Sequence, residues 1–196
     1  MDFGQVLAQR RMVRRYLPDP VDAAVLRRIL DRARRGPSAG HSQGQRFVVV
    51  TDPDRRARIA ALCGEPQHVA AGREPWLSTA PVHVVVCVRL AAYVERYAEP
   101  DKACARGPEG WTVPFWWVDG GAALMLLLLA AVDEGLGAGL LDVGDPDALR
   151  ALLGIPEDVD VLGLVTIGRP AEAARVVGSA RRLRLPFDAV VRSERW

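Results

Sequence analysis

The chain has 196 residues, of which 49% are hydrophobic, and its 26 basic and 24 acidic side chains leave a formal net charge of +2. This hydrophobic fraction excludes a mainly disordered chain, and the length is most simply that of one domain, residues 1–196, with a full-sized core. The charge balance, with no basic stripe interleaved with aromatic residues, argues against a nucleic-acid-binding protein.

The first half of the chain predicts three helices and one strand. A short helix is expected over residues 2–11, before a turn whose two prolines forbid helix. Asp22 is placed to cap a second helix over residues 23–35. A buried strand over residues 47–51 then leads into a helix that starts at a proline and ends at Gly64.

The second half contains one very apolar helix over residues 121–134, which should be central and buried because it is hydrophobic all round. Two segments rich in Gly, Pro and charge, residues 65–78 and 93–112, predict loops or a lid. The remaining expected elements are a strand over residues 82–89, a short apolar stretch over 140–143, a helix from Asp145 to Leu153 and a strand over 160–168. This succession of helices and strands indicates an α/β or α+β fold.

The signals for location favour the cytoplasm. The longest apolar run, residues 122–132, is shorter than the roughly 20 residues that a membrane span requires. The first 15 residues lack the apolar core of a signal peptide. Three cysteines, Cys63, Cys87 and Cys104, have spacings that fit no metal motif, and we expect them to be reduced thiols. We therefore expect a cytoplasmic protein without a membrane partner or a metal site.

Ser38 lies within Gly36-Pro37-Ser38-Ala39-Gly40, which matches the G-x-S-x-G pattern of a serine hydrolase. The nucleophile of such an enzyme follows a strand and opens a helix, whereas here a predicted helix precedes the motif and a predicted strand follows it. The triad histidine should also come late in the chain, and the last histidine is His83. The pattern therefore argues against a nucleophilic Ser38.

Arginines gather at the end of the first predicted helix, and they allow two interpretations. Arg10, Arg11, Arg14 and Arg15 could simply favour the negative C-terminal end of that helix. Alternatively, their guanidinium groups could bind the oxygens of a dianionic phosphate through paired hydrogen bonds. A second arginine group lies in residues 180–184.

The glycine-rich stretch E-G-L-G-A-G, residues 134–139, fails as a dinucleotide-binding fingerprint because it follows a helix rather than a strand. One interpretation is a glycine that ends the helix. The other is that Gly137 and Gly139 allow bare backbone to approach a flat ligand. Because the sequence also lacks a phosphate-binding P-loop, a redox cofactor would have to be held in another way.

Six stretches, taken in order, resemble the FMN-dependent nitroreductase superfamily over nearly the whole chain. They are R-R-M-V-R-R-Y (10–16), P-S-A-G-H-S-Q (37–43), D-G-G-A-A-L (119–124), L-G-I-P-E-D (153–158), I-G-R-P (167–170) and the terminal E-R-W. The resemblance implies an α+β nitroreductase-like fold with a central mixed sheet flanked by helices, in a domain-swapped homodimer with FMN at the subunit interface. It also implies hydride transfer from NAD(P)H to FMN and on to a nitroaromatic, a quinone or a similar flat, electron-poor small molecule.

The same resemblance assigns cofactor contacts by position. The FMN phosphate and the polar edge of the flavin fall to Arg10, Arg11 and Arg14, with Met12 in the place of the family's serine, and to Arg184, with Arg182 as its alternate. The residues that would line the flavin from the partner subunit are Pro37, Ser38, His41 and Gln43. The backbone at Leu140 and Leu141 would approach flavin N5 and O4. Because N5 carries the chemistry, no catalytic side chain is expected.

Two assignments and the activity have alternatives. His41 stands where the family has an asparagine, and it would either contact the flavin or cap a turn. The aromatic group Trp111, Phe115, Trp116 and Trp117 would either stack on flat substrates or belong to the core. The family's Pro-Trp is replaced by Gly44-Gln45, so another branch of the superfamily (a dehydrogenase, dehalogenase or flavin-fragmenting enzyme) or an FMN-binding protein without turnover is an alternative to a reductase.

Overall fold

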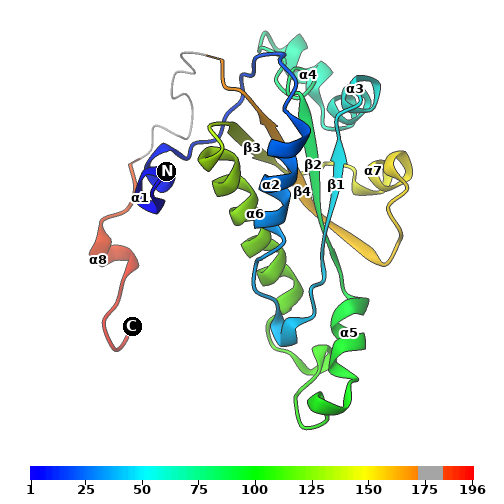
Figure 1. The fold of residues 1–196 in the computed structure, drawn as a ribbon, viewed down its shortest axis with the longest axis vertical. Coiled ribbons are helices and arrows are strands. Elements are labelled where there is room, and N and C mark those ends of the chain that lie inside the picture. The colour runs from blue at the N-terminus through cyan, green and yellow to red at the C-terminus, as the bar shows by residue number, and fades with distance from the viewer. Residues whose placement is uncertain (172–182) are drawn as a thin grey trace.

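The computed structural model describes residues 1–171 and 183–196, and its centre is a four-stranded sheet (Figure 1). The strands are β1 (Gln45–Val50), β2 (Val82–Arg89), β3 (Gly137–Leu141) and β4 (Val159–Gly168), in the order β1-β2-β4-β3. All three strand pairs are antiparallel, so the expected mixed sheet is wrong for the described strands. Among the described residues, parallel pairing is limited to one isolated bridge between Met12 and Ala138. The N-terminal segment runs beside β3 for too few residues to form a fifth strand.

Helices cover both faces of this sheet. One face is covered by α2 (Ala23–Ala33) and α6 (Phe115–Asp133), and the other by α3 (Pro53–Leu62) and α7 (Pro146–Leu153), with α4 (Glu65–Ala70) packed against α3. The other helices are α1 (Phe3–Gln9), α5 (Ala91–Tyr97) and α8 (Phe187–Val190), with short 3-10 turns at Ala39–His41 (η1), Pro100–Lys102 (η2) and Pro108–Gly110 (η3). The chain therefore has the α+β class of fold that the sequence predicts.

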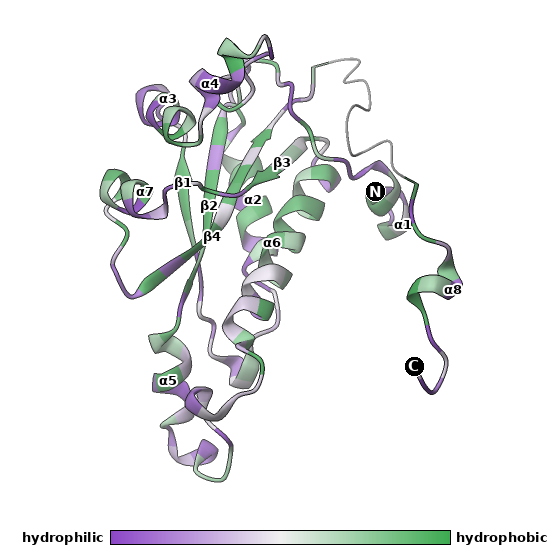
Figure 2. Cartoon of the chain, turned by 180° about the vertical axis from the view of Figure 1, so that it is seen from behind, coloured by the Kyte–Doolittle hydropathy of each residue, from purple (hydrophilic) through white to green (hydrophobic). Residues whose placement is uncertain are grey.

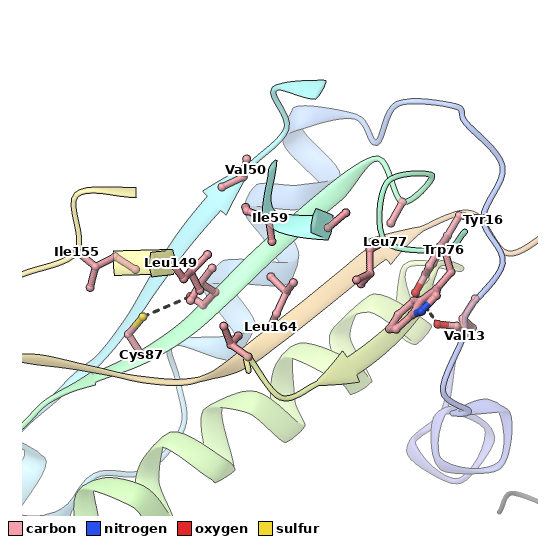
Figure 3. Packing of buried hydrophobic residues seen from close by; sticks show 14 of the residues in the cluster. Val13, Tyr16, Val50, Ile59, Trp76, Leu77, Cys87, Leu149, Ile155 and Leu164 are labelled. Carbon is pink, nitrogen blue, oxygen red and sulfur yellow. Dashed lines mark hydrogen bonds between the residues drawn. The ribbon is translucent and has the colours of Figure 1, made fainter. Parts of the chain in front are cut away.

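Strand β2 divides the core into two clusters. Because side chains alternate along a strand, Val84 and Val86 pack toward α2 and α6, whereas Val85 and Cys87 pack toward α3 and α7. The second cluster, with Ile59 from α3 among its members, is drawn in Figure 3. Burial on both faces explains why β2 is apolar on both sides, apart from His83 and the terminal Arg89.

The expectation of a buried strand over residues 47–51 is wrong in its burial. Strand β1 lies at the edge of the sheet, and Val49 is 37% exposed.

Several predicted local signals are confirmed. Asp22 caps α2 by accepting the backbone N–H groups of Ala24 and Val25 at 2.8 and 3.1 Å. Helix α3 starts at Pro53 after its Asp52 cap, and Gly64 follows it with a φ of 77°. These short-range devices depend on residues close together in the chain, so the sequence is sufficient to predict them.

Three expectations for the second half are wrong. The segments expected as loops contain α4 and α5, and α6 begins at Phe115 rather than at Gly121. Long-range contacts stabilise these helices: the Glu65 carboxylate at the start of α4 accepts the backbone N–H groups of Trp76, Leu77 and Ser78. The third error is the short apolar stretch, because β3 spans Gly137–Leu141 instead of residues 140–143.

Helix α6 has a buried and an exposed side. By length and composition it is, among the described helices, the one that could cross a membrane, yet it packs here as a partly buried core helix. Its outward side carries Val118, Ala122, Met125 and Leu129 at helical spacing, with Val118 51% and Met125 45% exposed. Figure 2 shows the hydrophobic colouring continuing around the C-terminal half of this helix. We call these four residues the outer stripe of α6.

Candidate functional site

The arginine-rich segment, residues 10–16, lies in extended conformation against β3. Val13 N–H donates to the carbonyl oxygen of Ala138 at 2.9 Å. The buried Tyr16 hydroxyl donates to Val13 O at 2.8 Å and is also hydrogen-bonded to Thr166 Oγ1 at 2.8 Å. Burial raises the pKa of Tyr16, so this hydroxyl keeps its proton. The segment is therefore fixed at Val13, and the arginines on either side of it lie on an anchored backbone.

The four arginines contact different neighbours. The Arg14 guanidinium lies 5.5 Å from the ring centroid of Trp76 and forms no ion pair among the described residues. Arg15 forms a two-pronged ion pair with Glu74. Arg11 lines a cavity of about 420 Å³ between α1, the C-terminal end of α6 and β3. Because α1 ends at Gln9, the attraction of a helix C-terminus accounts for Arg10 but not for Arg14.

Beyond its contact with the arginine-rich segment at Ala138, strand β3 has a free backbone edge. Backbone groups of alternate residues in an antiparallel strand point to opposite sides, and Ala138 O already faces the arginine-rich segment. Leu140 has the same orientation as Ala138, so its N–H and C=O point away from β4, beyond the last described contact with residues 10–16. The sequence predicts that the backbone of Leu140 and Leu141 contacts a flavin. Leu140 has its backbone groups on the free edge, whereas those of Leu141 face β4.

The glycines of β3 are explained by packing within the chain. A Cβ atom on Gly137 would lie 2.6 Å from the Val13 side chain, and one on Gly139 would lie 2.4 Å from Val13 O. The helix-ending glycine is Gly135, which has a φ of 75°. Close approach of backbone is therefore real at Gly137 and Gly139, and the partner that the structure places there is the arginine-rich segment itself.

Residues 37–43, which we call the Ser38 loop, form a strained turn between α2 and β1. Gly40, His41 and Gln43 have φ values of 61°, 59° and 50°, a conformation that is costly for the two residues that are not glycine. Ser38 Oγ accepts the Gln43 N–H at 2.9 Å, so this hydroxyl closes the turn. The structural context of a nucleophile is absent here, as the sequence predicts, because a helix precedes the loop and a strand follows it.

Side chains from other elements hold the Ser38 loop in this conformation. Arg96 Nε of α5 donates to Gly40 O at 2.8 Å, and Arg46 Nη1 of β1 donates to Gln43 O at 2.7 Å. Asp119 Oδ2 of α6 accepts the Ala39 N–H at 2.9 Å. Arg96 and Arg46 are not predicted from the sequence, and Asp119 occurs there only as the first residue of the D-G-G-A-A-L motif. No local signal reveals these residues, because their partners are distant in the chain or are backbone atoms.

His41 lies at the surface of this loop, beside a polar cavity of about 480 Å³ that the loop shares with α5. Its side chain makes no hydrogen bond to any described residue, so the structure does not support its use as a turn cap. An exposed imidazole with free nitrogen atoms is suited to contact a ligand instead.

Three members of the predicted aromatic group pack together at the N-terminal end of α6, whereas Trp117 is 37% exposed and belongs to none of the described aromatic pairs. Trp111 stacks on Trp116 with centroids 6.1 Å apart, and it meets Phe115 edge-on at 5.4 Å and Tyr97 edge-on at 5.0 Å. Phe115 is 43% exposed, whereas Trp111 and Trp116 are half-buried. The group is thus a small aromatic cluster with one open side, which combines features of both interpretations.

Within one chain the two halves of the predicted site lie at opposite ends of α6. The Ser38 loop contacts the beginning of the helix at Asp119, and the cavity beside Arg11 reaches its end at Val132. At 1.5 Å per residue these points are about 20 Å apart. In Figure 1, α5 and the start of α6 are accordingly far from α1.

The C-terminal arginines lie apart from this site. Arg184 is exposed on a segment that leads past α1 to α8 (Figure 1), and Arg182 lies outside the described residues. The same segment also exposes Leu183, Phe187 and Trp196, by 90%, 73% and 99%. The structure of the single chain therefore does not bring Arg184 to the other predicted phosphate ligands.

In the described part of the chain, no three His, Cys, Asp or Glu side chains are placed to hold a metal ion.

Comparisons with known proteins match this architecture. The model of the nitroreductase family matches residues 7–169. An "NADH dehydrogenase" of Thermus thermophilus is 34% identical over 97% of this chain and 95% of the relative. An "FMN reductase [NAD(P)H]" of Bacillus subtilis is 30% identical over 97% of this chain and 72% of the relative. A "5,6-dimethylbenzimidazole synthase" of Rhodobacter capsulatus is 31% identical, with 85% and 82% of the two chains covered.

The fold is also that of solved structures. A nitroreductase family protein of Streptococcus pneumoniae superposes with a TM-score of 0.77 at 20% identity, covering 98% of this chain and 100% of that one. This likeness establishes the nitroreductase-like arrangement of the sheet and its flanking helices.

Proposed function

Because this chain belongs to the nitroreductase family and is an NAD(P)H oxidoreductase, we propose that it binds FMN and passes reducing equivalents from NAD(P)H to a flat, electron-poor acceptor such as a nitroaromatic or a quinone. The observation that carries this proposal is Arg14, which stacks on Trp76 without an acidic partner in the described chain and follows Val13, the residue that bonds β3 two positions before its free backbone edge at Leu140. A cation and backbone hydrogen-bonding groups side by side suit the phosphate and the polar edge of a flavin.

The residues present fit FMN in two groups. Arg14 and Arg10 would hold the phosphate by charge-assisted hydrogen bonds, with Arg11 and Arg184 as further candidates, and Leu140 would offer its N–H and C=O to the polar atoms of the ring. The Ser38 loop would line the ring with Pro37, Ser38, His41 and Gln43. When bound, FMN supplies hydride acceptance and donation at N5. The protein's tasks are then to orient the ring, exclude water and keep one face open.

We propose that the complete site forms between two copies of the chain. The loop contacts α6 at Asp119, and the cavity beside Arg11 reaches Val132, about 20 Å further along the helix by its rise, so we infer that the two parts contact one flavin from different subunits. A second copy that packs its outer stripe against the first would bury Val118 and Met125 and bring the loop of one chain near Arg14 of the other. The exposed apolar C-terminal segment supports the same interface.

The acceptor would lie near Phe115, because this side chain is the most exposed member of the aromatic cluster. Trp111 and Trp116 support it from behind, so Phe115 could stack on a planar substrate without loss of core packing. We keep the cytoplasm as the proposed location, where the three free cysteines would remain reduced.

Reduction of the bound flavin tests the proposal. The purified protein is mixed with NADH or NADPH in a stopped-flow instrument, and the loss of flavin absorbance is followed. Rapid reduction followed by reoxidation with a quinone or nitroaromatic is expected. Tight FMN binding with slow reduction by both donors would instead favour an FMN-binding protein without turnover.

A second candidate is another branch of the family. It is favoured by the relative named 5,6-dimethylbenzimidazole synthase and by the altered Ser38 loop, in which His41 presents free nitrogen atoms beside the proposed site. Consumption of the flavin itself in air, detected as loss of FMN by chromatography, would support that branch.

A further inference from the structure

Asp119 is a buried carboxylate in the first part of an otherwise apolar helix. It is 5% exposed, and its described partners are both on Oδ2: the Ala39 N–H at 2.9 Å and the Tyr93 hydroxyl at 2.8 Å. A buried charge is costly unless hydrogen bonds satisfy it, so this position is retained only while both donors are in place. A single oxygen atom thus joins the Ser38 loop to α5.

The loop side of this junction depends on support from outside. His41 and Gln43 have left-handed backbone conformations, which persist only where surrounding structure over-determines them. Arg46, which also bonds this loop, is exposed, and Arg96 is half-buried and shared with Glu99 and Asp101. Among these described hydrogen bonds to the loop, the one that Asp119 Oδ2 accepts from the Ala39 N–H is the one that water is least able to replace, because Asp119 is buried.

Tyr93, the residue of α5 that donates to Asp119, also packs against the aromatic cluster. The fully buried Tyr93 ring meets Trp111 edge-on at 6.1 Å and Trp116 at 6.5 Å. A Cβ atom on Gly44 would lie 2.2 Å from this ring, so the residue directly after the loop must be glycine. Burial, followed by the hydrogen bond to Asp119, raises the pKa of Tyr93. The hydroxyl therefore stays protonated and donates.

We propose that Asp119 is the positioning residue of the flavin site. Because its Oδ2 accepts hydrogen bonds from Ala39 and from Tyr93, it fixes the Ser38 loop and the aromatic cluster in one relative arrangement. Asp119 is buried behind both parts and acts through them. The inference rests on the proposed function, because it assigns the Ser38 loop to the flavin and the aromatic cluster to the acceptor.

The test measures the dissociation constants of FMN and riboflavin for the full-length wild type and three variants. Asp119→Ala, which removes both hydrogen bonds, is expected to weaken the binding of both flavins by about tenfold and to leave their affinity ratio unchanged, because the loop contacts the ring and not the phosphate. Asp119→Asn keeps an accepting oxygen and is expected to restore most of the affinity. Tyr93→Phe, which cuts only the link to α5, is expected to raise the KM for the acceptor more than it weakens FMN binding.

A control variant separates positioning from general stability. Leu127→Val removes one methylene group from the buried side of the same helix, so it should lower the melting temperature without changing either flavin constant or the visible circular dichroism of bound flavin. Equal flavin affinities in wild type and Asp119→Ala would overturn the proposal. If Asp119→Ala does not fold, unchanged KM and flavin circular dichroism in Tyr93→Phe would overturn it instead. A wild type that binds no flavin at all would overturn the proposed function as well.

Discussion

Substitution of Arg14 by alanine is the most direct test of the phosphate site. In the free protein Arg14, among its described contacts, has only its stacking on the Trp76 ring to lose, which is worth about 0.5–1 kcal/mol. In the complex it would also lose charge-assisted hydrogen bonds to the phosphate, worth about 1.5–3 kcal/mol. FMN binding should therefore weaken by roughly tenfold to a hundredfold, whereas riboflavin, which lacks the phosphate, should bind almost as before.

The assay measures both dissociation constants by flavin fluorescence in one buffer, for wild type, Arg14→Ala and Arg15→Ala. Arg15 is the matched control, because it is the adjacent arginine and its guanidinium is already paired with Glu74 at the surface. Loss of such an exposed pair costs about 0–1 kcal/mol of stability and should leave the FMN to riboflavin ratio unchanged. An unchanged ratio in Arg14→Ala would remove Arg14 from the site and refute the assignment of the N-terminal motif.

Three further outcomes are expected. The purified protein should release FMN and not FAD on heat denaturation, because the arginines suit one terminal phosphate, and chromatography of the released flavin identifies it. Met125→Lys should produce monomers in analytical ultracentrifugation and abolish FMN binding, since a charge is introduced into the outer stripe of α6, whereas Val69→Lys on the exposed side of α4 should do neither. Burial lowers the pKa of His83 to about 4 from 6.5, so the unfolded chain binds more protons than the folded one between these values. Stability is therefore complete above pH 6.5 and falls by at most about 3 kcal/mol as the pH drops to 4, and urea unfolding of wild type and His83→Gln should show that the variant loses less over this range.

The sequence predicts most of the fold because its signals there are local. Asp22 lies next to the helix that it caps, and the period of apolar residues in α2 identifies the side that packs on α6. The apolar residues over 82–89 predict a strand, and the structure confirms it as β2. The two missed helices are different: α4 depends on Glu65 bonding backbone more than ten residues away, and α5 depends on the burial of Tyr93. Contacts of that range leave no periodic pattern in a single sequence.

The same distinction applies to the candidate site. Arginine, serine and glutamine side chains in recognisable motifs predict which residues face a ligand, whereas the residues that support them are revealed only by three-dimensional contacts. Asp119 is 80 residues from Ala39 and 26 from Tyr93, and Arg96 is 56 residues from Gly40. The sequence also cannot place Arg14 and the Ser38 loop at opposite ends of one helix, because this separation depends on how α6 crosses the sheet.

That separation leads to a prediction that distinguishes a site within one chain from a site between two. If each flavin contacts Arg14 of one subunit and the Ser38 loop of its partner, a dimer of one Arg14→Ala chain and one Gln43→Gly chain contains one site with both defects and one with neither. Glycine is chosen at position 43 because it removes the side chain and tolerates the φ of 50°. After the two variants are unfolded together and refolded in equal amounts, random pairing should restore tight FMN binding in about a quarter of all sites. If both contacts came from the same chain, every site in the mixture would keep one defect, and no tight binding would return above that of the separate variants.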